Sequence, residues 1–132
     1  MTDAALPPLT AHLGYWLRLV SNHVSHGFAR RLENRAVTVA EWVVLRELHD
    51  AESLSPSRLA TRLGLTRGAV SKLADRLIAK QLVARTADET DGRGQFLALT
   101  RAGRALVPEL AALADANDAA FFGHLPAEER QL

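Results

Sequence analysis

The sequence predicts a mainly α-helical fold that carries a single β-hairpin. Apolar residues recur at spacings of three and four over most of the 132 residues, which is the period of one face of a helix. That period is interrupted once, at residues 82–99, where two short runs typical of strands flank a polar loop with two glycines. Four Ser or Thr residues stand directly before helical runs, where their hydroxyl groups can cap the first turn.

The first predicted element is a long amphipathic helix from about Leu9 to Leu32. It is longer than the core of a small domain needs, so we expect part of its apolar stripe to meet a partner surface. The apolar positions of this stripe, spaced mostly by three and four, are Leu9, Leu13, Trp16, Leu17, Val20, Val24, Phe28 and Leu32.

Two N-terminal caps define the next helices. Thr38 is followed three residues later by Glu41, which is the pattern of a capping box, and the helix that it starts should end near residues 49–52. Ser55 followed by Pro56 predicts an N-cap with proline at the first helical position, and hence a short helix.

A tight turn separates this short helix from another. Gly64 is the residue type that most often ends a helix, because it adopts the left-handed conformation without strain. Thr66 is predicted to cap the following helix, which spans residues 67–80.

A hairpin and further helices complete the chain. Strands are predicted at 82–86 and 95–99, and Thr100 should cap a last long helix. Another helix is expected to begin near Pro126 and to be cut short at Leu132. Two helices joined by a tight turn and followed by a hairpin form a winged helix-turn-helix, in which the second helix enters the major groove of DNA.

Charge is distributed unevenly along the chain, whose formal net charge is +1. Residues 55–104 carry ten Lys or Arg against four Asp or Glu, a net +6, so the remainder is −5. A basic middle between acidic flanks suits a face that binds a polyanion. The chain has no Cys, which excludes disulfides, thiolate metal sites and cysteine nucleophiles. No secretory leader or membrane-spanning run is apparent, so we expect a cytoplasmic protein.

The helix at 67–80 has an exposed polar face suited to DNA. Arg67 could form a bidentate contact with guanine, and the small Gly68 would permit close approach. The alternative is a solvated basic face whose charges only pair with neighbours. The residues predicted to contact DNA in and beside the helix-turn-helix are Ser55, Thr66, Arg67, Gly68, Ser71, Lys72 and Arg76.

Several runs closely resemble the MarR family of bacterial regulators: 55–60 (SPSRLA), 65–77 (LTRGAVSKLADRL), 82–85 (LVAR), Asp91-Gly92-Arg93 and 97–103 (LALTRAG). The resemblance implies an α+β winged fold and a homodimer that binds a pseudo-palindromic operator on double-stranded DNA, most often as a repressor. It divides the chain into an N-terminal dimerisation helix (1–35), a winged helix-turn-helix domain (36–100) and C-terminal dimerisation helices (101–132).

The resemblance also assigns residues of the wing. Asp91 and Arg93 match the family's wing pair, in which the acid orients the Arg toward the minor groove or the backbone. A narrow minor groove attracts Arg electrostatically. The alternative is an ion pair that only stiffens the hairpin. Gly94 stands where family wings often carry a second Arg, a departure that could weaken the wing contact.

Members of the family are often released from DNA by a small anionic aromatic compound. Candidate residues for such an effector are His12, Trp16, Trp42 and Arg46, although both Trp residues could simply pack. We expect no metal site and no cofactor. The sequence carries no catalytic motif, so an enzyme is not expected. The remaining alternative is a winged helix that docks proteins instead of DNA, which salt dependence would distinguish.

Overall fold

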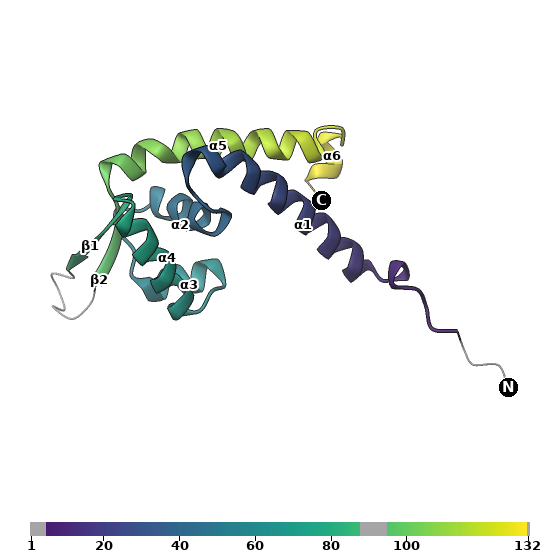
Figure 1. Cartoon of the computed structure of the whole chain (residues 1–132), viewed down its shortest axis with the longest axis horizontal. Helices are drawn as coiled ribbons and strands as arrows, with labels where there is room; N and C mark the ends of the chain where they lie inside the picture. Colours follow the sequence, from purple (N-terminus) through teal and green to yellow (C-terminus); the bar gives the residue numbers. More distant parts are fainter. Residues whose placement is uncertain (1–4, 88–94, 132) are drawn as a thin grey trace.

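A computed structural model describes residues 5–87 and 95–131, and its elements follow the predicted order (Figure 1). Two long helices, α1 (Leu13–Leu32) and α5 (Arg101–Phe122), pack against each other. In Figure 1 the N-terminal half of α1 extends away from the rest of the chain. The other elements are the 3-10 helices η1 (Leu9–Ala11) and η2 (Glu33–Arg35), the helices α2 (Val39–His49), α3 (Pro56–Leu63), α4 (Arg67–Ala79) and α6 (Ala127–Arg130), and the strands β1 (Val83–Ala87) and β2 (Gln95–Leu99).

The first long helix is shorter than predicted. It begins at Leu13 instead of Leu9, because His12 is extended and separates α1 from the single turn of η1. Pro8 precedes that turn and is itself extended, as the fixed φ of proline allows. Within the part of the chain that the structure describes, no helix is long and apolar enough to cross a membrane.

All four predicted N-caps are confirmed. The hydroxyl groups of Ser55, Thr66 and Thr100 each accept a hydrogen bond from the backbone N–H three residues on, at 3.1, 3.1 and 3.0 Å. Thr38 forms the complete capping box with Glu41: the Glu41 N–H donates to Thr38 Oγ1 at 3.1 Å, and the Thr38 N–H donates to Glu41 Oε1 at 2.8 Å. Each cap satisfies backbone donors that a helix start would otherwise leave unpaired.

One apolar core joins the helix-turn-helix and the hairpin to the two long helices. It draws on the C-terminal turns of α1, on α2, α3, α4 and both strands, and on the first half of α5. Full burial of one such side chain stabilises the fold by about 1.5–3 kcal/mol. The fully buried leucines are Leu32, Leu45, Leu48, Leu59, Leu77, Leu97 and Leu110.

The two helices of the helix-turn-helix end in the same way with different residues. Gly64 after α3 and Gln81 after α4 both adopt left-handed backbone, with φ of 67° and 63°. At each end the next residue closes the turn: the Leu65 N–H donates to the Ala60 carbonyl and the Leu82 N–H to that of Leu77, both at 3.0 Å. These are Schellman motifs. The sequence predicted the one at Gly64 but not the one at Gln81.

The hairpin is attached to the helix-turn-helix at its base. Strands β1 and β2 pair antiparallel from Val83 opposite Leu99 to Ala87 opposite Gln95. Leu54, in the loop before α3, exchanges two backbone hydrogen bonds with Leu97, at 2.9 and 2.8 Å, so β2 is paired on both edges. The hairpin therefore has a defined position relative to α3 and α4.

Candidate nucleic-acid interface

The outward face of α4 gathers most of the residues predicted to contact DNA. All are exposed, namely Thr66, Arg67, Gly68, Ser71, Lys72 and Arg76. The opposite face is buried through Val70, Leu73, Ala74 and Leu77. Because residues four apart are neighbours on a helix, Arg67 lies beside Ser71 and Gly68 beside Lys72. The N-terminal half of this face therefore presents two cations, the Ser71 hydroxyl group and, at Gly68, a position without a side chain, all near the positive end of the helix dipole.

Ser55 and Thr66 have a structural role in addition to any contact with DNA. Each hydroxyl oxygen accepts the capping hydrogen bond described above, so Ser55 Oγ and Thr66 Oγ1 hold the first turns of α3 and α4 in place. A hydroxyl group that accepts in this way can still donate its hydrogen to a phosphate oxygen. Both residues lie at helix N-termini, where backbone N–H groups favour anions.

The structure divides the basic residues of 55–104 into two groups. Four of them bond to other elements: Arg62 to Glu47, Lys80 to Glu41, Arg85 to Asp75 and Arg104 to the His49 carbonyl. Within residues 5–87 and 95–131, in contrast, no ion pair is formed by Arg58, Arg67, Lys72, Arg76 or Arg101. Arg93 lies outside these ranges. The sequence could not separate these groups, because the partners lie 10 to 55 residues away.

Lys80, which directly follows α4, and Glu41 of α2 form an ion pair that the sequence did not predict. Glu41 is fully buried, whereas the side chain of Lys80 is 37% exposed. Burial is the largest single influence on the pKa of Glu41 and acts to raise it. Hydrogen bonds from Lys80 and Thr38, together with the charge of Lys80, outweigh burial and lower the pKa below its ordinary value. The capping-box pattern identifies Glu41 from the sequence, but no local pattern identifies Lys80 as its partner.

A second ion pair links α4 to the hairpin. Arg85 of β1 donates to Asp75 on α4, and both side chains are largely exposed. For Asp75 this is the pairing that the solvated-face alternative anticipated. The pair lies between the helix and strand that a winged helix-turn-helix presents to DNA.

Three of the sequence predictions fall on the wing. Asp91, Arg93 and the departure at Gly94 lie outside the described residues. Their roles stay predictions.

The four candidate effector residues are not brought together within one chain. Trp16 donates from Nε1 to the Thr10 carbonyl at 2.7 Å, near the N-terminal end of α1 where His12 also lies. Trp42 packs edge-on against Phe28, with ring centroids 6.1 Å apart. Trp16 and Phe28 are twelve positions apart on α1, which separates them by about 18 Å along the helix axis. Arg46 pairs with Asp50 on the surface of α2.

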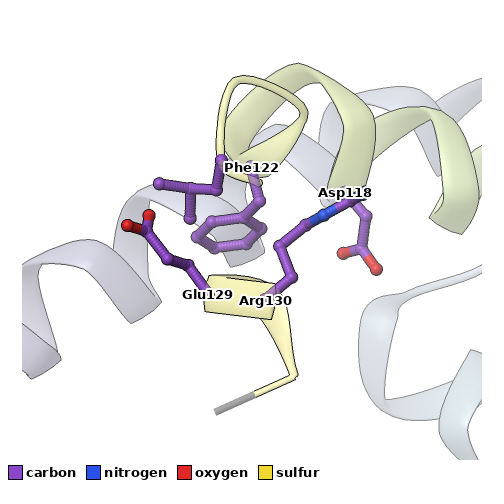
Figure 2. Close-up of a pocket in the computed structure, with 5 residues that line it drawn as sticks. Asp118, Phe122, Glu129 and Arg130 are labelled. Atoms are coloured by element: carbon purple, nitrogen blue, oxygen red, sulfur yellow. The ribbon is translucent and has the colours of Figure 1, made fainter. Parts of the chain in front are cut away.

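A hollow of about 340 Å³ lies elsewhere, between α5 and α6. Figure 2 shows the Phe122 ring directed between the side chains of Glu129 and Arg130, with Asp118 beside them. None of the four candidate effector residues lines it. Within residues 5–87 and 95–131, no three His, Asp or Glu side chains gather as metal ligands would.

Buried anchoring of α4, an exposed basic face at its start and an adjoining hairpin together define a DNA-binding protein of the winged helix-turn-helix class. A family model described as MarR family matches residues 37–94. The chain is 31% identical over 121 residues to the HTH-type transcriptional repressor Rv2887 of Mycobacterium tuberculosis, covering 92% of this chain and 87% of that protein. The chain belongs to the MarR family of transcriptional regulators, and it is not an enzyme.

Solved structures agree with this assignment. A mutant of E. coli MarR complexed with operator DNA superposes with a TM-score of 0.84 at 26% identity, covering 90% of this chain and 86% of that one. BpsR of Bordetella bronchiseptica, whose DNA binding is regulated by 6-hydroxynicotinic acid, gives 0.88 at 28% identity, with coverages of 96% and 91%. The fold with its hairpin wing and its paired N- and C-terminal helices is therefore that of the family.

Proposed function

We propose that the protein is a homodimeric repressor that reads a pseudo-palindromic operator with the N-terminal half of α4. The observation that carries this proposal is the outward face of α4, where Arg67 and Lys72 form no ion pair with any described residue. Positive charges that pair with no described residue favour a polyanion. The fork of Arg67 matches the two acceptors of guanine, whereas Lys72, a point charge, suits phosphate. Arg93 and Asp91 would extend the contact through the wing.

Support for the homodimer comes from the N-terminal part of the chain. Leu13 is 80% exposed, Leu17 is 71% exposed and Val20 is 47% exposed on one side of α1, and Leu6 and Leu9, which precede this helix, are exposed too. A contiguous apolar surface of this kind is typical of an interface. A second copy of the chain is the occupant that the family's dimeric architecture supplies, and a two-fold dimer would read an inverted repeat.

The experiment is a selection of bound sequences from random duplex DNA, with the purified protein at two salt concentrations. We expect an inverted repeat whose half-sites lie about one helical turn apart. Arg67→Ala should lose about 1–3 kcal/mol of binding free energy and relax the preference at one base position. Arg46→Ala, which removes the same charge from the surface of α2, outside the dimerisation helices and the predicted DNA face, is the matched control and should bind like the parent. Weak binding without sequence enrichment or salt dependence would favour the protein-docking alternative.

A second proposal concerns release from DNA by a small anionic aromatic compound. It is favoured by the similarity to BpsR, whose DNA binding is regulated by such an acid. Trp42 packs on Phe28, which lies about 18 Å along α1 from Trp16. A ligand site that used both Trp residues would therefore require residues from two protomers. The chain has two Trp residues, so their fluorescence reports on each after single replacement by Phe. A shared site predicts that an aromatic carboxylate quenches the remaining Trp in both single variants. Quenching of only one variant, or of neither, would contradict it.

A further inference from the structure

The ammonium group of Lys80 has three acceptors and joins three parts of the chain. Its Nζ atom donates to the Ala36 carbonyl at 2.7 Å, to Glu41 Oε1 at 2.8 Å and to Glu41 Oε2 at 3.0 Å. An ammonium group has three hydrogens, so this arrangement uses all of them. Although Lys80 directly follows the recognition helix and belongs to the basic segment, its charge is committed within the protein and not to phosphate.

These acceptors lie where α1 turns into α2. Ala36 follows η2 and adopts left-handed backbone with a φ of 55°, which directs the chain from one helix into the other. Glu41 lies in the first turn of α2, fully buried, where it also accepts from the Thr38 N–H. The Lys80 side chain therefore connects the C-terminal end of α4 to the junction between α1 and α2.

The rest of α4 contacts other neighbours. Its packing partners with the most contacts are α2, α3 and β1, whereas α1 packs chiefly on α2 and α5. The hydrogen bond from Lys80 to the Ala36 carbonyl is therefore a polar link between the end of α4 and the junction of α1 with α2, an addition to the apolar packing of α4 on its other neighbours. Charge-assisted hydrogen bonds are short and directional.

We propose that Lys80 is a positioning residue that sets the orientation of the recognition helix α4 relative to α1. This inference rests on the proposed homodimer in one respect: if α1 joins two protomers, the orientation of α4 on α1 sets the separation of the two recognition helices. Lys80 then determines which half-site spacing the dimer accepts, while the outward face of α4 determines which bases it reads.

The first test measures the orientation without DNA. The chain has no Cys, so cysteines introduced at Ser25 on α1 and Ser71 on α4, both exposed, can carry spin labels at unique sites. Distances between the labels are measured by pulsed electron paramagnetic resonance, with labelled chains diluted into unlabelled protein. The variant is the double substitution Glu41→Gln with Lys80→Met. It removes both charges together, and a Gln at this position still completes a capping box, so the variant should fold.

We expect the double variant to broaden or shift the distance distribution relative to the parent. Arg76→Met, which removes a cation from α4 without touching these bonds, should leave the distribution unchanged. A distribution in the double variant that matches the parent would overturn the proposal, because α4 would then be oriented by the core alone.

The second test uses the duplex recovered by the selection, together with versions in which one base pair is added or removed between the half-sites. The parent should lose affinity on altered spacing at least about tenfold, comparable to a mismatched base pair. The double variant should lose much of this discrimination, whereas Arg76→Met should weaken binding to all three duplexes equally. Retained discrimination in the double variant contradicts the proposal. If the parent binds no duplex specifically, the proposed function fails, and the label distances still decide the role of Lys80.

Discussion

The outward face of α4 and the N-terminal half of α1 are both left uncovered by the rest of the chain, but they differ in chemistry and in anchoring. The outward face of α4 is basic, and four residues on the opposite side of this 13-residue helix are buried in the core. In the 20-residue α1, the buried residues are Gly27, Phe28 and Leu32, all in its last two turns. Its first half therefore exposes an apolar stripe without support from the core.

The difference indicates what each surface requires. A basic face on a rigid helix can bind a polyanion without rearrangement, because the core has already fixed its backbone. An exposed apolar stripe gains free energy only when another apolar surface covers it. We therefore expect substitutions beneath α4 to affect folding, substitutions on its face to affect DNA binding, and substitutions on the α1 stripe to affect assembly.

The largest expected effect is on the support of α4. Leu77→Ala removes a fully buried side chain and should lower the free energy of unfolding by about 2–5 kcal/mol. Leu65→Ala is the matched control: Leu65 is 39% exposed in the same helix-turn-helix, so its truncation should cost much less. Urea denaturation measures both. Equal losses would contradict the placement of α4 on the core.

The next effect concerns assembly. Leu17→Asp places a charge in the middle of the exposed stripe and should raise the dimer dissociation constant by about tenfold or more, since a buried Leu contributes about 1.5–3 kcal/mol. Asn22→Asp adds the same charge on the opposite face of α1 and should leave assembly unchanged. Analytical ultracentrifugation over a range of concentrations distinguishes the two. A Leu17→Asp variant that remains as dimeric as the parent would assign the stripe another role.

A smaller effect, on the salt dependence of DNA binding, distinguishes the roles of Lys72 and Lys80. Lys72→Ala should weaken DNA binding about equally across sequences and reduce the slope of log affinity against log salt by about 1. The Glu41→Gln, Lys80→Met double variant should keep the parental slope, because the Lys80 ammonium is already hydrogen bonded within the protein. Fluorescence anisotropy at several salt concentrations gives the slopes. A parental slope for Lys72→Ala together with a reduced slope for the double variant would assign the phosphate contact to Lys80 instead of Lys72.

Gln81 offers a modest gain in stability. A side chain in left-handed backbone costs about 1–2 kcal/mol, so Gln81→Gly relieves strain and should raise the free energy of unfolding by up to about 1 kcal/mol after the greater freedom of the unfolded chain is subtracted. Ala79→Gly, in helical backbone two positions earlier, should lose about 0.5–1 kcal/mol. Thermal unfolding compares the two variants, and destabilisation by Gln81→Gly would count against a strained turn.

The last prediction concerns acidic pH. The folded-state pKa of Glu41 is below its ordinary value, so its ionisation stabilises the fold above that value, and the contribution is lost as the pH falls through the lowered pKa. The advantage of the parent over Glu41→Gln should therefore shrink between about pH 6 and about pH 3. Asp50, whose pKa Arg46 lowers at the surface, provides the comparison: Asp50→Asn should change the pH profile far less. An unchanged advantage at low pH would argue against the buried ion pair.

Features with a local cause could be predicted. The caps at Thr38, Ser55, Thr66 and Thr100 depend on hydrogen bonds spanning three residues, and all four are formed. The glycine turn and the hairpin likewise follow from short-range conformational preferences. The residues on the face of α4 could be named because helical period alone separates its polar side from its apolar side.

Features that depend on distant partners could not be predicted. Lys80 and Arg85 look like any other residue of the basic segment, and only the fold brings them to Glu41 and Asp75. The Leu54 bridge to β2 has no local signal either. Trp16 and Trp42 were grouped by residue type, whereas the length of α1 separates them.

The sequence by itself determined the helices, their caps, the hairpin and the family, because each depends on neighbouring residues or on a pattern of local motifs. Only the tertiary structure decided which cations face outward and which hold elements together, and which apolar side chains remain uncovered. Those properties depend on how elements far apart in the chain approach one another, and no local pattern records that approach.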